Sequence, residues 1–439
     1  MYHRKCMTKK KVLLIGIDTI VEPLGLMYIT AALKQGGNHV DLELIKEKTD
    51  ISDIKLKSGY DFVGFSVLTG NHKRLLKLSQ RYREAGVKTI VGGPHATFFA
   101  NETLPFADFV VVGEGIKAVL DVVNGGARPG IVRTDLTAAD EFPFADREEL
   151  YKDPKKLGNR IKNLLTGFGC PFSCNYCCNS AFNRMFPRFL RQRSVDNVIQ
   201  EAKKLLKYRP LELIFFQEDY FGMNLSWLKE FAEKWPREIN IPFHCQIRPE
   251  FGTEKRLKLL KKAGCHGISV GIETMNEKLR RKILGRGGTN KQITEGCLRI
   301  KKFGFKLRTF EMIGLPFLSI QDDLETLKFN CLIQPNFARA EMYLPLRFSV
   351  LGELCIKEGL WDGSEVPFEG KELSMDSESV LNYDPEHKKK LLLLQKIFHL
   401  AAHLPYGDKI AKEFIAMENP KLDDFLSLVR KYMMDGLYL

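Results

Sequence analysis

Two blocks of alternating strand-like and helix-like segments constrain the fold of this 439-residue chain more than any other feature. In the first block, β-branched runs occur at residues 12–17, 41–45, 62–67, 89–93 and 109–112, with helix-like segments at 25–35, 72–85 and from 116. Strands that alternate with helices pair in parallel, and the helices cover both faces of the sheet. The first block therefore predicts a doubly wound, Rossmann-like α/β domain over residues 1–126.

A segment rich in proline and charge follows, and we expect it to be an exposed linker at residues 127–158. After it, strand-like runs at 163–167, 211–216, 243–247, 267–272, 307–313 and 338–344 alternate with helix-like segments near 195–208, 225–235, 254–263, 290–303 and 320–332. Six such units predict a partial (β/α)6 barrel over residues 159–345, with functional residues at the carboxyl ends of its strands. Residues 346–439 are expected to form a mainly helical C-terminal region.

The composition, with 44% apolar and 28% charged residues, is that of a globular protein. The net charge of +13 is dispersed over helix-like segments, and no basic tract interleaved with aromatic residues is present, so we expect no nucleic-acid partner. The apolar run at 12–17 is too short for a signal peptide, and no stretch approaches the ~18 apolar residues of a membrane span. We expect a cytoplasmic protein without a transmembrane segment, in which metal-binding or catalytic cysteines are favoured over a disulfide framework among the ten cysteines.

Three cysteines, Cys170, Cys174 and Cys177, lie within eight residues after a predicted strand. Thiolates are the usual ligands of iron–sulfur clusters, and this spacing lets one loop hold three irons. A cluster with only three protein ligands leaves one iron able to bind and activate a substrate. Buried or zinc-binding cysteines are the alternative, but zinc motifs normally supply four ligands in two pairs. Cys178 falls outside the spacing, and we expect it not to be a ligand.

The pattern Cys-x-x-x-Cys-x-Tyr-Cys, with Tyr176 before the last cysteine, resembles the radical S-adenosylmethionine (SAM) superfamily. The resemblance implies that Cys170, Cys174 and Cys177 hold a [4Fe–4S] cluster, which cleaves SAM reductively to methionine and a 5′-deoxyadenosyl radical. It also implies an electron donor such as flavodoxin or ferredoxin, and it makes Tyr176 a SAM contact. Because the cofactors carry the chemistry, we assign no amino-acid side chain as a catalytic residue.

Residues at successive strand ends match further SAM contacts that the resemblance implies. Glu218 and Asp219 resemble the acidic pair of which one member accepts the SAM amino group, and Arg248 is expected to pair with the SAM carboxylate. Glu273 resembles the acid that binds the ribose hydroxyls, and Gly314 resembles the glycine that lets backbone approach the adenine. Singly, Asp219 and Glu273 could be ordinary surface carboxylates. Their occurrence in series after the cysteine loop favours the functional interpretation.

Four patches at strand ends of the first block, at 23–27, 66–69, 91–96 and 112–115, resemble the cobalamin-binding domain of one large radical SAM class. The cobalamin contacts that they imply are Leu24, Ser66, Thr69, Gly92, Gly93, His95, Gly113 and Glu114. The chain lacks the Asp-x-His-x-x-Gly motif that gives cobalt a lower histidine in methionine-synthase-like domains, so we expect base-off cobalamin with no histidine ligand. A plain Rossmann-like domain, or one that has lost its cobalamin, is the alternative.

Together the resemblances imply a cobalamin-dependent radical SAM enzyme similar to the class B methyltransferases. We expect C-methylation of a small-molecule or lipid-like metabolite. A cyclase, rearrangement or oxidation enzyme of the same architecture is the alternative, whereas an iron–sulfur sensor or a nucleic-acid-binding protein would not need the series of SAM contacts. The apolar residues at 391–402 are expected to pack in a core, with a substrate channel or a membrane-facing helix as alternatives.

Overall fold

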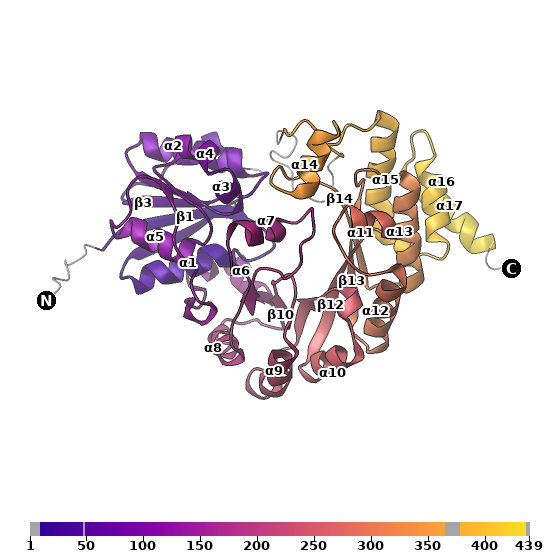
Figure 1. Cartoon of the computed structure of the whole chain (residues 1–439), viewed down its shortest axis with the longest axis horizontal. Coiled ribbons are helices and arrows are strands. Elements are labelled where there is room, and N and C mark those ends of the chain that lie inside the picture. The colour runs from indigo at the N-terminus through magenta and orange to yellow at the C-terminus, as the bar shows by residue number, and fades with distance from the viewer. Residues whose placement is uncertain (1–8, 47–48, 365–377, 436–439) are drawn as a thin grey trace. The chain divides into compact units, whose positions relative to one another are not determined.

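The computed structural model describes residues 9–46, 49–364 and 378–435 (Figure 1). The chain divides into two compact units. The first contains the described residues up to Phe168 together with Phe186–Ile214, and the second contains Gly169–Met185 and the described residues from Phe215 onward. Two six-stranded sheets organise the chain.

The first sheet is parallel throughout and has the strand order β2-β1-β3-β4-β5-β6. Its strands are β1 (Lys11–Asp18), β2 (His39–Lys46), β3 (Phe62–Ser66), β4 (Lys88–Gly92), β5 (Phe109–Val111) and β6 (Gly130–Val132). Five of the six strands coincide with predicted runs. The sixth, β6, pairs with β5 from inside the segment predicted as a linker.

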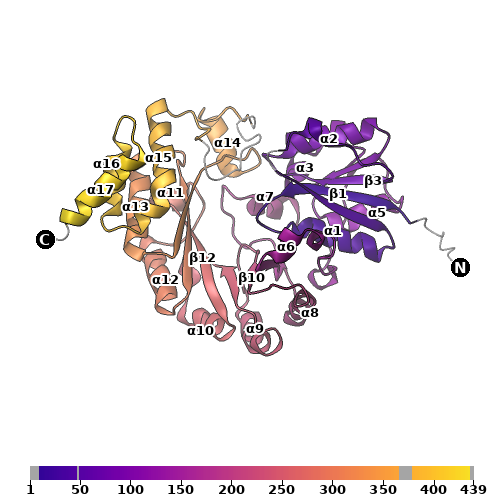
Figure 2. The ribbon, with the colours of Figure 1, turned by 180° about the vertical axis from the view of Figure 1, so that it is seen from behind.

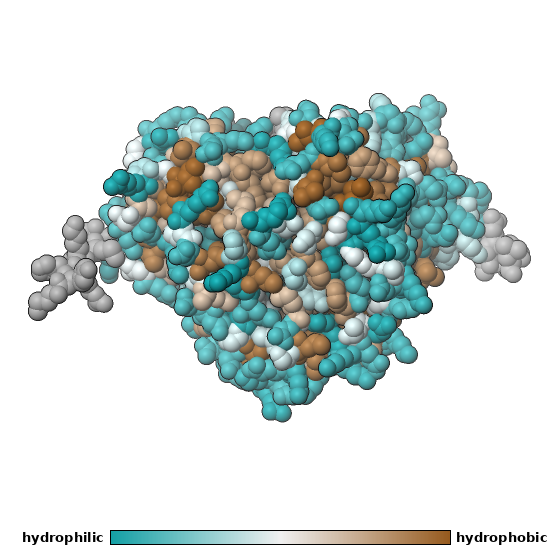
Figure 3. Space-filling view, viewed as in Figure 1, coloured by the Kyte–Doolittle hydropathy of each residue, from teal (hydrophilic) through white to brown (hydrophobic). Residues whose placement is uncertain are grey.

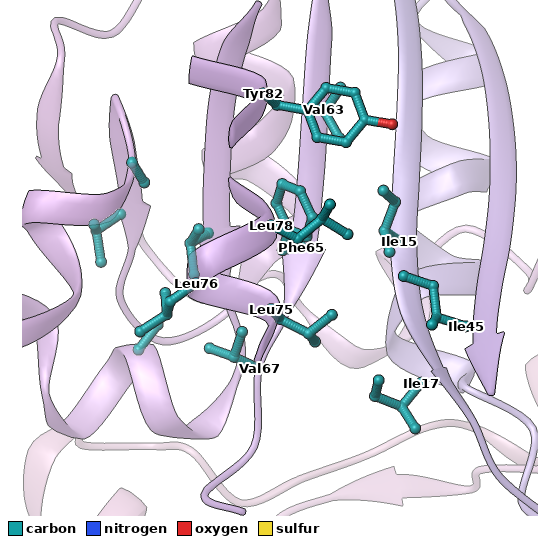
Figure 4. Close-up of a cluster of buried hydrophobic side chains, with 14 of the residues drawn as sticks. Ile15, Ile17, Ile45, Val63, Phe65, Val67, Leu75, Leu76, Leu78 and Tyr82 are labelled. Atoms are coloured by element: carbon teal, nitrogen blue, oxygen red, sulfur yellow. The ribbon is translucent and has the colours of Figure 1, made fainter. Parts of the chain in front are cut away.

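Hydrophobic cores cover both faces of this sheet, because successive side chains of a strand point to opposite sides. Val12 and Leu14 of β1 belong to the core that includes α1 (Leu24–Gln35) and α5 (Gly115–Val123). Leu13 and Ile15 belong to the opposite core, where Figure 4 shows Leu75, Leu78 and Tyr82 of α2 (His72–Glu84) packed against Ile15, Val63 and Phe65. The predicted doubly wound, Rossmann-like arrangement is therefore confirmed.

The strands of the second sheet follow one another in chain order, β7-β10-β11-β12-β13-β14. They are β7 (Ile161–Leu164), β10 (Leu213–Phe216), β11 (Phe243–Gln246), β12 (Cys265–Glu273), β13 (Lys306–Ile313) and β14 (Phe337–Met342), and β11 to β14 pair in parallel. The intervening helices are α8 (Val195–Leu205), α9 (Leu225–Glu238), α10 (Glu254–Lys262), α12 (Asn290–Lys302) and α13 (Ile320–Ile333). Figures 1 and 2 show α10 and α12 on the same face of this sheet. The predicted succession of strands and helices is confirmed.

Short elements around the cysteine motif were not predicted. The run at 163–167 was expected to be one strand, but β7 ends at Leu164. Beyond it, β8 (Gly167–Phe168) pairs with β9 (Arg191–Gln192) as a separate antiparallel two-stranded sheet. In the sequence, the cysteine loop and α7 (Cys178–Met185) lie between β8 and β9. Helix α11 (Glu277–Lys282) in the second unit was also not predicted, whereas α14 (Val350–Lys357) lies in the region expected to be mainly helical. All of these elements are too short to show a clear hydrophobic period.

The C-terminal region is helical, as expected, with α15 (Pro385–Ala402), α16 (Gly407–Ile415) and α17 (Leu422–Asp435). Leu391, Leu394 and Phe398 of α15 are fully buried in a core shared with Ile313 of β13 and Met342 of β14. The expectation that these apolar residues pack in a core is therefore confirmed. Figure 3 shows mainly hydrophilic residues over α16 and α17. No helix within the described ranges combines the length and the apolar character needed to cross a lipid bilayer.

Candidate active site

Cys170, Cys174 and Cys177 line one cavity of about 430 Å³ in the second unit. Cys174 is buried and the other two are half-buried, and all three thiols are free. The remaining lining residues come from the cysteine loop and the strand ends, namely Phe172, Tyr176, Asp219, Gln246, Ile247, Arg248, Ser269, Gly271, Glu273, Arg286, Phe310 and Glu341. Three thiols on one cavity wall, each able to bind a different iron, fit the chemistry of an iron–sulfur cluster.

Side-chain amides hold the cysteine loop from both sides. Asn175 donates from its backbone to the Leu284 carbonyl at 2.9 Å and from Nδ2 to the Ile283 carbonyl at 2.8 Å. Asn183 of α7 donates from Nδ2 to the Cys170 carbonyl at 2.7 Å. The loop conformation that presents the thiols is therefore set by the protein itself.

The three thiols experience different surroundings. Burial raises the pKa of Cys170 to about 11. A hydrogen bond from Cys178 lowers the pKa of Cys177 to about 7. At Cys174, Arg248 donates from Nη2 to Sγ at 2.8 Å, and the same guanidinium stacks on Phe172 with its carbon 3.6 Å from the ring centroid. The hydrogen bond from Cys178 therefore favours the thiolate form of Cys177, the form that binds iron.

The acidic pair after β10 divides between two environments. Asp219 lines the cavity and accepts a 2.8 Å hydrogen bond from Nδ2 of Asn179, while burial raises its pKa. Glu218 is buried and is not among the lining residues, and its backbone carbonyl accepts a 3.4 Å hydrogen bond from Gln246. The structure therefore places Asp219, and not Glu218, among the residues that line the cavity, and their contact with SAM stays a prediction.

Tyr176 and Glu273 meet at the other side of the cavity. The Tyr176 hydroxyl donates to Oε1 of Glu273 at 3.0 Å, and Nη1 of Arg286 lies 3.5 Å from the same oxygen. Glu273 has a φ of 67°, a left-handed conformation that is rare outside glycine and directs its carboxylate into this cluster. Arg286 also donates from Nη2 to the Gly271 carbonyl at 2.5 Å. Sequence reasoning missed Arg286, because no motif marks it.

Gly314 lies outside the cavity lining. Its φ of 69° requires a left-handed turn, and a Cβ at this position would lie 3.0 Å from both Leu391 and Met342. Its N–H donates to Oδ2 of Asp323 at 3.3 Å. In this structure the glycine permits close packing of β13 against α15, and its expected approach to adenine stays a prediction.

The residues expected to contact cobalamin gather at the carboxyl ends of the first sheet's strands. Ser66 ends β3, Gly92 ends β4, and Thr69 bonds to Nδ1 of His95 through Oγ1 at 3.0 Å. The His95 ring is buried and stacks on His72 at 3.7 Å. Leu68 and Ile20, in loops at the same edge, are 46% and 93% exposed, so apolar side chains are available to a large ligand.

The other residues of this expected set have internal partners. A Cβ on Gly93, whose φ is 101°, would lie 2.7 Å from the Val67 carbonyl, and one on Gly113 would lie 2.8 Å from the Phe186 ring. Leu24 is buried at the start of α1. Glu114 forms a 2.8 Å ion pair with Arg191 and accepts a 2.8 Å hydrogen bond from the Thr137 N–H. Packing and ion pairing within the first unit can therefore account for these residue types. Their contact with cobalamin stays a prediction.

Comparison with known proteins recognises two domains in this chain. The model of the radical SAM superfamily matches residues 164–329, and that of the B12 binding domain matches residues 10–123. An uncharacterized methyltransferase of Pyrococcus horikoshii is 26% identical over 374 residues, which cover 78% of this chain and 80% of the relative.

Solved structures share the fold of nearly the whole chain. The radical SAM methyltransferase TsrM of Kitasatospora setae, with cobalamin and a [4Fe–4S] cluster bound, has a TM-score of 0.66 at 15% identity and covers 98% of this chain and 100% of its own. TsrM has also been solved with a tryptophan substrate and a SAM analogue. OxsB, a cobalamin-dependent SAM radical enzyme, has a TM-score of 0.69 at 17% identity and covers 98% of this chain and 76% of its own.

Proposed function

Because this chain belongs to the radical SAM enzymes that carry an N-terminal B12-binding domain, we propose that it methylates carbon on a small-molecule substrate. The observation that carries the proposal is the combination of a B12-binding domain with a cavity lined by three free thiols in one chain. The methyltransferase names of the Pyrococcus horikoshii relative and of TsrM support methyl transfer. The tryptophan bound to TsrM supports a small molecule, with a lipid-like metabolite included in the proposal.

In this proposal, different side chains of the cavity bind different chemical groups of SAM. Asp219 accepts the SAM amino group, Arg248 pairs with the SAM carboxylate, and the Tyr176–Glu273 pair holds the ribose hydroxyls. Cys170, Cys174 and Cys177 hold the cluster. When bound, the cluster and cobalamin supply the electron that cleaves SAM and the methyl group that is transferred. Phe172 and Phe310 exclude water from the cavity wall and so protect a reactive radical.

The surroundings of these cofactors are part of the same proposal. Cobalamin binds base-off with no histidine on cobalt, which is supported by the missing Asp-x-His-x-x-Gly motif and by the burial of His95 against His72. The electron comes from a flavodoxin or ferredoxin, and the reaction takes place in the cytoplasm.

The stoichiometry of the nucleoside products tests methyl transfer. Anaerobic enzyme loaded with cobalamin is reduced in the presence of methyl-deuterated SAM and a small-molecule metabolite extract, and products are followed by mass spectrometry. We expect equal 5′-deoxyadenosine and S-adenosylhomocysteine, because one SAM is cleaved and a second donates its methyl group. An extract compound should gain the labelled methyl. If a compound changes while 5′-deoxyadenosine forms alone, the reaction is not a methyl transfer.

The pH dependence of SAM affinity tests the role of Asp219. Burial raises the pKa of this carboxyl, so it takes up a proton at a higher pH than an exposed aspartate does. Only the ionised form attracts an ammonium group, and SAM affinity is therefore expected to fall as pH decreases through the raised pKa. Asp219→Asn should bind SAM roughly tenfold more weakly and lose this pH dependence.

The matched control is Glu218→Gln, which makes the same chemical change at the neighbouring carboxyl outside the cavity lining. Equilibrium binding of SAM to the cluster-loaded protein is measured across the pH range for all three proteins. Wild-type pH dependence in Asp219→Asn, or its loss in Glu218→Gln, would assign the amino-group contact to another residue.

A further inference from the structure

A second cavity, of about 310 Å³, opens in the same unit at the amino-terminal ends of β11, β13 and β14. Its lining residues are His244, Lys306, Leu307, Arg308, Asn336 and Phe337. None of them lines the cysteine cavity, which lies at the opposite ends of these strands. The second cavity is therefore distinct from the cavity in which SAM is proposed to bind.

Arg308 is the distinctive side chain of this cavity. Its guanidinium carbon lies 4.6 Å from the ring centroid of Phe310 and 5.1 Å from that of Phe337, so aromatic rings hold it in place. Its Nε is buried and has no hydrogen-bond partner. Among the residues that the structure describes, no carboxylate lies within 4 Å of its nitrogens. The side chain is half-buried, so the guanidinium has lost water at Nε without gaining an anion.

The neighbouring charges do not neutralise Arg308. Glu341 acts on it only at longer range, because this carboxylate forms its ion pair with Nε of Arg339 at 2.5 Å. Two guanidiniums on adjacent strands thus share one carboxylate, and exposed Lys306 adds a third positive charge at the rim. Burial first, and then repulsion from Arg339, lower the pKa of Arg308.

His244 does not balance this charge either. Its Nε2 bonds to the Ser269 hydroxyl at 2.7 Å, and its ring stacks on Phe215 at 5.0 Å. Burial, together with the charge of Arg308, lowers the pKa of His244 to about 4, so the ring is neutral near pH 7. The cavity consequently has a net positive wall with aromatic surfaces beside it.

We propose that this cavity is a binding site for an oxyanion, the carboxylate or phosphate group of a small molecule, with Arg308 as its principal contact. A partly buried charge without an anionic partner is costly, and an oxyanion that enters the cavity offsets that cost. The planar fork of an arginine matches two oxygens of a carboxylate or a phosphate. Phe337 offers a surface for an apolar part of the ligand, and Lys306 attracts the anion at the entrance.

Thermal unfolding of the full chain with benzoate and with inorganic phosphate, against chloride at equal ionic strength, tests the proposal. The wild-type Tm is expected to rise with at least one of the two probes, because a ligand that binds only the folded state stabilises it. Benzoate alone would indicate a carboxylate site, and phosphate alone a phosphate site. Arg308→Met should abolish the rise and bind the probe roughly tenfold to a hundredfold more weakly by titration calorimetry.

Arg237→Met, at an exposed arginine of α9, serves as the control and should respond as the wild type does. If Arg308→Met does not fold, Arg308→Lys is used, which keeps the charge, loses the fork and should show a reduced rise. Equal rises in the wild type and the Arg308 variant, or no rise of the wild type with either probe, would overturn the proposal. SAM cleavage is not the readout, so these outcomes are independent of the proposed methyl transfer.

Discussion

Replacing Cys174 with alanine is expected to abolish both the iron–sulfur absorbance of the anaerobically purified protein and its cleavage of SAM. Among the described residues, three thiols line the cavity, so the loss of one is expected to leave two irons of the cluster without protein ligands. Cys174 also accepts a 2.8 Å hydrogen bond from Arg248, and replacing it with alanine removes this hydrogen bond. Iron content, visible absorbance and 5′-deoxyadenosine formation measure the effect.

Cys178→Ala is the matched control, because this thiol is adjacent to Cys177 but outside the spacing of the motif. The Cys178 thiol donates a hydrogen bond to Cys177. Its replacement should therefore change the visible absorbance of the cluster without preventing cluster assembly. Circular dichroism checks that both variants are folded. A Cys174→Ala protein that keeps the cluster, or a Cys178→Ala protein that loses it, would show that the ligand set has been assigned incorrectly.

The strands and the helices between them could be predicted because burial imposes a period on their sequences. The runs that became β1, β3 and β14 are apolar on buried faces and are bounded by glycine or polar residues. Parallel strands bring their carboxyl ends together, so residues far apart in sequence were expected to share one site. Tyr176, Asp219, Arg248 and Glu273 do line one cavity with the three cysteines.

Other parts of the site depend on tertiary contacts that leave no periodic pattern in the sequence. Beyond the end of β10 at Phe216 the alternation of side chains stops, so the sequence could not tell which of Glu218 and Asp219 faces the cavity. Arg286 follows the short helix α11 and lies 3.5 Å from Glu273, whose positive φ no periodic pattern indicates. The ion pair of Glu114 with Arg191 involves the strand pair β8–β9, which is too short to predict, and the expected contact of Glu114 with cobalamin stays a prediction.

Replacing Glu201 with alanine is expected to lower the free energy of unfolding by about 3–5 kcal/mol, because Arg193 would be left as a buried charge without its partner. The side chains of Arg193 and Glu201 are only 1% and 2% exposed, and Nη1 of the arginine lies 2.5 Å from the glutamate. Glu201 also accepts a 3.0 Å hydrogen bond from the Ala145 N–H. Removing it therefore leaves an unpaired charge and an unpaired amide in the same core.

This ion pair also supports the backbone from which the cysteine loop departs. Arg193 donates from Nη1 to the Leu165 carbonyl at 2.8 Å and from its backbone to the Thr166 carbonyl at 2.9 Å, four residues before Cys170 in the chain. Glu201→Ala should therefore lose iron faster than the wild type. Urea unfolding measures the stability, and Glu212→Ala, which breaks the exposed Arg160–Glu212 pair, is the control with an expected cost below about 1 kcal/mol. Equal costs for the two variants would mean that burial does not strengthen the Arg193–Glu201 pair.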